Sequence, residues 1–158
     1  MQKTLKEKKL IKWMSIVSIL FIIISAYLLY LHYADVTSFC DISEGLSCDI
    51  VNKSRYSEFP PGSGIPVSLM GIITFIIVLI TLKYIKKNKT FNVGNKKIDK
   101  KNLSRFLFYL MIISLLFSIY LVYAELFLIL SLCILCVALD ILIIIMLILS
   151  YKLKEAFL

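Results

Sequence analysis

The chain has 158 residues, 60% of them hydrophobic, and carries a formal net charge of +8. Ordinary soluble domains are about 45–50% apolar, so this composition excludes an average soluble protein and indicates one compact membrane domain. The basic residues flank apolar stretches instead of forming a stripe on a soluble surface, which argues against nucleic-acid binding.

Four apolar stretches are long enough to cross a bilayer, which takes about 20 residues in a helix. They cover about residues 11–31, 65–82, 103–123 and 129–149. Pro66 falls in the first turn of the second stretch, where the missing N–H would be unpaired in any case. The sequence therefore predicts an all-α membrane protein, built as a bundle of four transmembrane helices.

The first apolar stretch has a competing interpretation as a cleaved signal peptide, because basic residues precede it. At residues 11–31 it is longer than the apolar core of a typical signal peptide, about 7–15 residues. No small-x-small cleavage site follows it, since the chain continues as His32-Tyr33-Ala34-Asp35. We therefore expect a retained transmembrane helix.

The positive charges are distributed unevenly along the chain and predict its topology. Sixteen of the 18 basic residues lie before or at the start of the first span, between the second and third spans or at the start of the third, or after the fourth. Such residues accumulate in cytoplasmic loops, so both termini and the second connection are expected in the cytoplasm of a multi-pass plasma or inner membrane protein. The sixteen are Lys3, Lys6, Lys8, Lys9, Lys12, Lys83, Lys86, Lys87, Lys89, Lys96, Lys97, Lys100, Lys101, Arg105, Lys152 and Lys154.

The first connection, residues 33–64, is expected outside the cytoplasm together with the short third connection. It carries only Lys53 and Arg55 as basic residues. Its acidic residues are Asp35, Asp41, Glu44, Asp49 and Glu58. The second connection, at residues 83–101, is expected to be a solvated loop that meets anionic lipid headgroups.

The first connection is also too long for a simple turn, and loops of that length are often functional. Its cysteines and its aromatic residues, such as Phe39 and Phe59, indicate an ordered extracytoplasmic loop. Residues 49–57 are predicted to form a short helix on the membrane surface. The proline- and glycine-rich run at residues 59–64 ends any helix before it.

Four cysteines are expected near the outward face: Cys40 and Cys48 in the first connection, Cys133 and Cys136 in the fourth span. Residues i and i+3 share one helix face, so the sulfurs of Cys133 and Cys136 can meet. We expect this pair about one turn into the helix, near its positive end, which favours the reactive thiolate. The outward face is oxidising, so the pattern favours disulfide exchange.

Two other uses of the cysteines are possible. A zinc ribbon needs a second pair at similar spacing, and the interval between Cys40 and Cys48 is too wide for a zinc knuckle. Two static disulfides would fit a small transporter or assembly subunit without a bound quinone.

In a relay, by contrast, the loop pair lies in water and meets a soluble thiol. The pair Cys133–Cys136 lies at the membrane boundary, where a lipid-soluble quinone accepts the electrons.

Five motifs along the chain resemble the vitamin K epoxide reductase family in its single-domain prokaryotic form, over residues 11–149. They are Cys40-Asp41-x5-Ser47-Cys48, Val51-Asn52-x-Ser54, Gly64-Ile65-Pro66-Val67-Ser68-Leu69-Met70-Gly71, Tyr120-Leu121-x-Tyr123 and Cys133-Ile134-Leu135-Cys136. The resemblance implies four helices around a quinone, either menaquinone or ubiquinone. It also implies an enzyme that oxidises a separate thioredoxin-like (DsbA-like) protein and so supports disulfide formation in exported proteins.

The resemblance further implies a role for each cysteine. Cys136 contacts the quinone, and Cys133 forms a transient disulfide with Cys48. Cys40 meets the partner protein. Ser54 corresponds to a loop serine near the quinone.

At two positions the chain departs from the animal members of the family. They have Asn where this chain has Val67 and Tyr where it has Asp140, and both side chains bind substrate or anticoagulant. These differences weigh against vitamin K epoxide reduction and animal-type drug sensitivity, while Val67 and Asp140 stay candidates for the quinone site. An acidic residue inside a span is a functional hypothesis by default. Asp140 either relays a proton or stays neutral, hydrogen-bonded to Ser114, Ser118 or Tyr120.

A DsbB-type oxidase also has four spans and four cysteines, but it carries its C-x-x-C in the first outer loop and another pair in the second. The third connection here is too short for that order. We interpret His32 as an interfacial residue and not as a ligand, and Glu125 as solvent-facing. Arg55 either stabilises negative charge in the site or meets a lipid phosphate.

Overall fold

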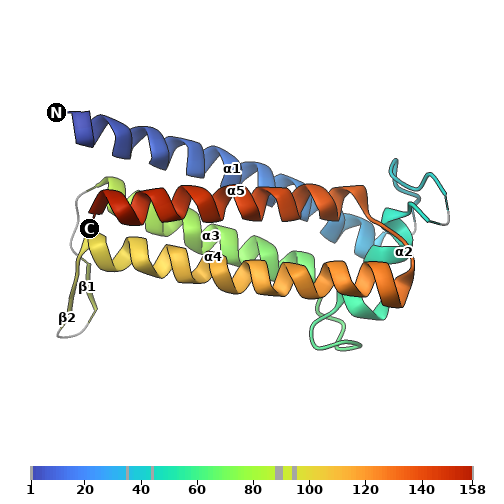
Figure 1. The fold of residues 1–158 in the computed structure, drawn as a ribbon. Coiled ribbons are helices and arrows are strands. Elements are labelled where there is room, and N and C mark those ends of the chain that lie inside the picture. Colours follow the sequence, from blue (N-terminus) through green and yellow to red (C-terminus); the bar gives the residue numbers. More distant parts are fainter. Residues whose placement is uncertain (1, 35, 44, 88–90, 94–95, 158) are drawn as a thin grey trace.

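The computed structural model describes residues 2–34, 36–43, 45–87, 91–93 and 96–157. Asp35, Glu44 and Lys89, which entered the topology argument, lie outside these ranges. Four long helices run side by side, as Figure 1 shows. They are α1 (Gln2–Tyr33), α3 (Val67–Lys86), α4 (Lys100–Tyr123) and α5 (Ile134–Phe157).

All four helices are long and apolar enough to cross a membrane. In lipid every backbone N–H and C=O needs a partner within the protein, and a helix supplies these partners locally. The predicted all-α bundle of four transmembrane helices is therefore confirmed. Pro66 immediately precedes α3 as its N-cap residue, one position before the predicted first turn.

The two ends of the bundle differ in what connects the helices (Figure 1). At one end, called the terminal end, α1 begins and α5 ends beside the short strands β1 (Phe91–Val93) and β2 (Lys96–Ile98). These strands pair antiparallel in the connection that was predicted to be a plain loop. At the other end, called the loop end, lie the first connection and the connection between α4 and α5.

The first connection folds over the loop end. The predicted helix at residues 49–57 is present as two shorter pieces, α2 (Cys48–Asn52) and the 3₁₀ turn η1 (Arg55–Ser57). Ser47 caps α2 by accepting the Ile50 N–H at 3.1 Å. The break follows from Ser54, whose backbone is extended and whose hydroxyl donates to the Val51 carbonyl at 2.7 Å.

The start of α5 differs from the sequence prediction. The third span continues past α4 as a π-helix, η2 (Ala124–Ile129), and α5 begins only at Ile134. The fourth span was predicted to begin at residue 129, which is wrong by five residues. Leu130 has a φ of 57°, in the left-handed region, and this conformation interrupts the helix. Hydropathy gives no sign of the break, because all of residues 126–135 except Ser131 are apolar.

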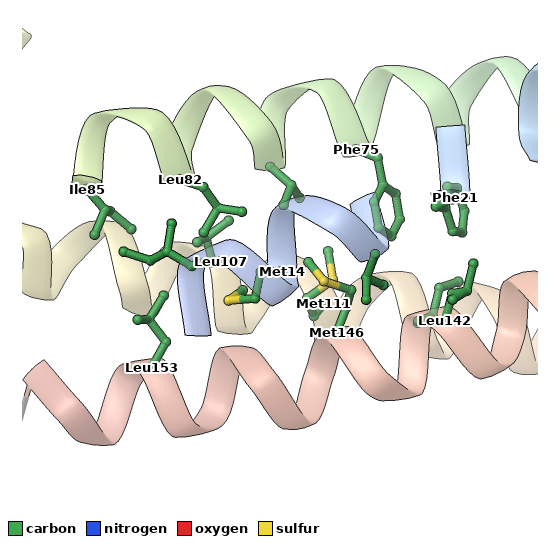
Figure 2. Packing of buried hydrophobic residues seen from close by; sticks show 14 residues of the cluster. Met14, Phe21, Phe75, Leu82, Ile85, Leu107, Met111, Leu142, Met146 and Leu153 are labelled. Atoms are coloured by element: carbon green, nitrogen blue, oxygen red, sulfur yellow. The ribbon is translucent and has the colours of Figure 1, made fainter. Parts of the chain in front are cut away.

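The core is densest in the half of the bundle nearer the terminal end. Here α1 packs along α3 and α5, and α5 packs along α4. Figure 2 shows the side chains that fill this half from all four helices. The fully buried ones include Met14, Leu82, Leu107, Met111, Met146 and Leu153. Near mid-bundle the rings of Phe21 and Phe75 stack with centroids 3.7 Å apart.

Candidate functional site

The four cysteines come together at the loop end of the bundle. Cys40 and Cys48 form a disulfide with their Cα atoms 5.6 Å apart, and Cys133 and Cys136 are free thiols. Cys40, Cys48 and Cys133 belong to one buried cluster, and Cys136 packs against it. The loop pair and the C-x-x-C pair, distant in the sequence, are therefore neighbours in space.

The sequence suggested that the loop pair lies in water, but the structure buries both of its cysteines. Cys40 is 2% exposed and Cys48 is 0% exposed. Leu28 and Leu31, from the end of α1, pack into the same cluster. The expectation was wrong because a loop sequence does not reveal that the loop folds back onto apolar residues of a neighbouring helix.

The C-x-x-C pair lies at the very start of α5, and not one turn inside it. Cys133 immediately precedes Ile134, the first residue of the helix. The first-turn N–H groups of a helix have no partner inside it, and the N–H of Cys136 donates to the Cys133 sulfur at 3.2 Å. This placement lets the positive end of α5 stabilise negative charge on that sulfur.

Glu125 is buried against the same pair. It is 4% exposed, so its interpretation as a solvent-facing residue was wrong. Its Oε2 accepts the backbone N–H of Cys133 at 3.2 Å, and its carboxylate interacts with the Cys136 thiol. The π-helix turns this side chain inward, which sequence spacing does not show. The available signal was an acidic residue in the continuous apolar stretch 121–130.

A cavity of about 410 Å³ lies between the four long helices and beneath the first connection. Most of its lining is apolar, and Phe21 and Phe75 form part of its wall. The four residues that we predicted for cofactor binding all line it: Cys136, Ser54, Asp140 and Val67. Glu125 lines it as well.

Five polar side chains of the cavity wall differ in their hydrogen bonding. Asp140 accepts a hydrogen bond from the Ser118 hydroxyl, so Ser118 is the partner among the three that the sequence left open. Ser114 donates to the Leu110 carbonyl of its own helix instead. The hydroxyl oxygens of Ser25 and Ser68 are buried and have no hydrogen-bond partner among the described residues.

The cavity opens sideways between α3 and α4, which contact each other much less than the other adjacent helix pairs. Three of its lining residues are exposed on the outer surface: Met70 of α3, Ile113 of α4 and Phe59 of the first connection. The Phe59 ring meets Phe117 of α4 edge-on, with centroids 5.4 Å apart. The opening is therefore apolar and faces the space that lipid fills around a transmembrane bundle.

The first connection is held to α1 by hydrogen bonds. The Nδ1–H of His32 donates to the Asn52 carbonyl at 2.7 Å, and the Asn52 side chain donates to the Leu28 carbonyl at 2.7 Å. His32 Nε2 also lies 3.8 Å from Glu58. His32 thus fastens the loop that covers the cysteines, which gives it a structural role that the sequence did not indicate.

Comparison with known proteins adds one finding to this geometry. The model of the vitamin K epoxide reductase family matches residues 12–151, which include both cysteine pairs and every lining residue of the cavity. A search of curated proteins finds no match to the chain.

Proposed function

The chain belongs to the vitamin K epoxide reductase family and is an oxidoreductase of the membrane, and on this basis we propose its reaction. It oxidises a thioredoxin-like protein outside the cytoplasm and passes the electrons through two cysteine pairs to a membrane quinone. The observation that carries the proposal is the shared cluster of both pairs, with Cys136 in the wall of the apolar cavity.

The residues of the cavity fit a quinone. Ligand pockets commonly measure about 300–1,000 Å³ and combine an apolar wall with a few polar groups. Here the unpartnered hydroxyls of Ser25 and Ser68 are available to donate to carbonyl oxygens. Ser54 of the first connection and Val67 at the start of α3 line the same cavity. A bound quinone supplies an acceptor for two electrons and two protons. The lateral opening suits a ligand that arrives from lipid.

The relay proceeds by thiol–disulfide exchange, in which a thiolate attacks one sulfur and the other sulfur leaves. A partner thiolate attacks Cys40 and releases Cys48. Cys48 then attacks Cys133 of the Cys133–Cys136 disulfide and releases Cys136 at the cavity wall. The second thiol of the partner then completes the partner's own disulfide and releases Cys40. Cys40 attacks Cys48, which restores the Cys40–Cys48 disulfide and releases Cys133. Two electrons have then moved from the partner to the thiols of Cys133 and Cys136.

Access to Cys40 requires a movement of the covering loop. The sulfur is buried, whereas exchange needs an open approach to the attacked atom. Gly45 of the first connection is hydrogen-bonded to the α4–α5 connection, since the Leu132 N–H donates to the Gly45 carbonyl at 3.0 Å. In our proposal the docking partner displaces the first connection at Gly45 and so reaches Cys40.

The proposed topology places both termini in the cytoplasm and the cysteines outside it, as the distribution of basic residues predicts. A reporter fused after Leu158 is expected to be active in the cytoplasm. One inserted beside Gly45 is expected to report the exterior. A cytoplasmic signal from the second site would contradict the topology and place the cysteines in a reducing compartment.

The decisive experiment measures quinol formation by the purified protein with two electron donors. With a reduced thioredoxin-like protein, both Cys40→Ser and Cys136→Ser are expected to lose activity. With dithiothreitol, which reduces Cys133–Cys136 directly, Cys40→Ser is expected to keep activity and Cys136→Ser to lose it. Equal loss in both variants with dithiothreitol would contradict the ordered relay. No quinol formation by the unmodified protein would contradict the proposed function.

A further inference from the structure

Glu125 is a buried carboxylate that the relay described so far does not use. It lies in the π-helix η2, between apolar neighbours, and is 4% exposed. Burying an acidic group away from water costs free energy unless partners compensate for it. π-Turns inside helices are rare and occur often at functional sites. Its presence beside the cysteines therefore calls for a physical reason.

The contacts of Glu125 place it between the sulfurs and the cavity. Its Oε2 accepts the N–H of Cys133 at 3.2 Å, its carboxylate interacts with the Cys136 thiol, and it lines the cavity. Its backbone carbonyl accepts the N–H groups of Leu130 and Ser131. The turn that interrupts the helix thus fixes the position of this carboxylate.

The chemistry of the pair requires a proton carrier at this place. When the thiols of Cys133 and Cys136 become a disulfide, two S–H bonds break and one S–S bond forms. Two electrons and two protons leave, and the quinone accepts both to become a quinol. The sulfurs are packed in an apolar cluster, so the protons need an acid–base group in contact with the pair. Asp140, the other carboxylate in the cavity wall, accepts a hydrogen bond from the Ser118 hydroxyl.

We propose that Glu125 takes the proton of the Cys136 thiol and releases it into the cavity, where the quinone is reduced. The Cys133 proton follows by the same carboxylate once the first has been released. This role rests on the proposed function, since it assumes that Cys136 delivers electrons to a quinone. It makes Glu125 a catalytic residue, because its carboxylate lies against the reacting Cys133–Cys136 pair in the wall of the same cavity.

The competing explanation is structural, since a carboxylate that accepts the Cys133 N–H also caps α5. Glu125→Gln separates the two roles. Its amide oxygen still accepts the N–H, but it does not accept a proton from a thiol. General acid–base groups contribute about 10²–10⁴-fold, so turnover with dithiothreitol is expected to fall at least ~100-fold. The matched control is Glu155→Gln, at the far end of α5, which is expected to keep the unmodified turnover.

Glu125→Asp provides the second comparison, because it keeps a carboxylate on a shorter side chain. Its turnover is expected to lie between those of the unmodified protein and Glu125→Gln. Unmodified turnover in Glu125→Gln would leave Glu125 as a capping residue only and overturn the proposal.

A spectroscopic readout tests the proton directly, without quinone. Infrared difference spectra between the dithiol and disulfide forms of Cys133–Cys136 are expected to show a change in the carboxyl C=O band. This band is expected to shift in Glu125→Asp and to vanish in Glu125→Gln. An unchanged carboxyl region in the unmodified protein would overturn the proposal, even if Glu125→Gln failed to fold. Absent quinol formation together with a changing carboxyl band would refute only the proposed function.

Discussion

The two halves of the bundle are built from the same four helices but differ in how side chains fill the space between them. In the half near the terminal end, large side chains such as Met14, Leu107 and Met146 meet at the bundle axis and leave it solid. In the half near the loop end, the inward positions carry small or polar residues such as Ser25 and Ser118, and a cavity remains. The difference shows that a few inward positions decide whether a helix bundle is solid or hollow.

The boundary between the halves lies at the stacked rings of Phe21 and Phe75. Gly71, one turn from Phe75 on α3, lies so close to α1 that an added Cβ would be 3.1 Å from the Phe21 ring. Its missing side chain therefore allows α1 and α3 to approach each other beside the cavity. The solid half holds the helices together, and the hollow half is free to hold a ligand and the reacting thiols.

The largest effect is expected where the hollow half meets the cysteines. Cys136→Ser removes the sulfur in the cavity wall that otherwise attacks Cys133 and displaces Cys48 from it. In this variant the Cys133 thiolate attacks Cys48 of the Cys40–Cys48 disulfide and releases Cys40. We expect this variant to accumulate the Cys48–Cys133 disulfide with Cys40 free. Non-reducing peptide mapping is the measurement. Finding Cys40 bonded to Cys133, with Cys48 free, would exchange the assigned roles of the two loop cysteines.

The next effect separates stability from activity. Leu107→Ala in the solid half deletes a fully buried side chain, which typically costs about 2–5 kcal/mol. The free energy of unfolding in detergent is expected to fall by this amount, while the folded fraction keeps its turnover. The matched variant Leu116→Ala changes a side chain exposed on the same helix and is expected to have little effect. Lost turnover in folded Leu107→Ala would contradict the division of roles.

A smaller effect is expected from the polar wall of the cavity. Ser118→Ala removes the hydrogen bond to Asp140, and hydrogen bonds to charged groups contribute about 1.5–3 kcal/mol. If Asp140 takes part in proton transfer, turnover is expected to fall about tenfold, by the lower of these values. Ser104→Ala, whose hydroxyl bonds the Lys101 carbonyl of the same helix, is the control. Equal turnover in both variants would assign Asp140 no part in the reaction.

The smallest effect concerns the unpartnered hydroxyl of Ser25. A hydrogen bond between neutral groups contributes about 0.5–1.5 kcal/mol, so Ser25→Ala is expected to raise the KM for quinone roughly two- to tenfold with kcat unchanged. Ser18→Ala on the same helix loses a hydroxyl that already bonds the Met14 carbonyl and is expected to leave KM unchanged. A matching rise in both variants would show that Ser25 does not donate to the ligand.

Much of this arrangement was predictable from local properties of the chain. Runs of apolar residues identified the four spans, because a helix in lipid needs about 20 such residues. The motifs around the cysteines indicated the family, and the family model confirms it. The residues proposed for the quinone, such as Ser54 and Asp140, all line one cavity, although their roles stay predictions.

Other features depended on contacts between distant segments. The burial of Cys40 comes from a loop that packs on Leu28 and Leu31 of α1, and nothing within the loop sequence specifies that docking. The inward side chain of Glu125 comes from a π-turn that ends at the left-handed Leu130. The residues around that turn are almost all apolar, so the hydropathy of the sequence does not fall there.

The sequence by itself therefore determined which segments enter the membrane, because hydropathy and charge are summed along the chain. It also determined which residues carry sulfur, and that two of them are spaced to react with each other. Only the tertiary structure decided that the loop pair is covered and that Glu125 contacts the C-x-x-C. It also decided that the space beside Cys136 stays open. Burial and empty volume depend on which helices meet and on how large their facing side chains are, and neither is a property of any single segment.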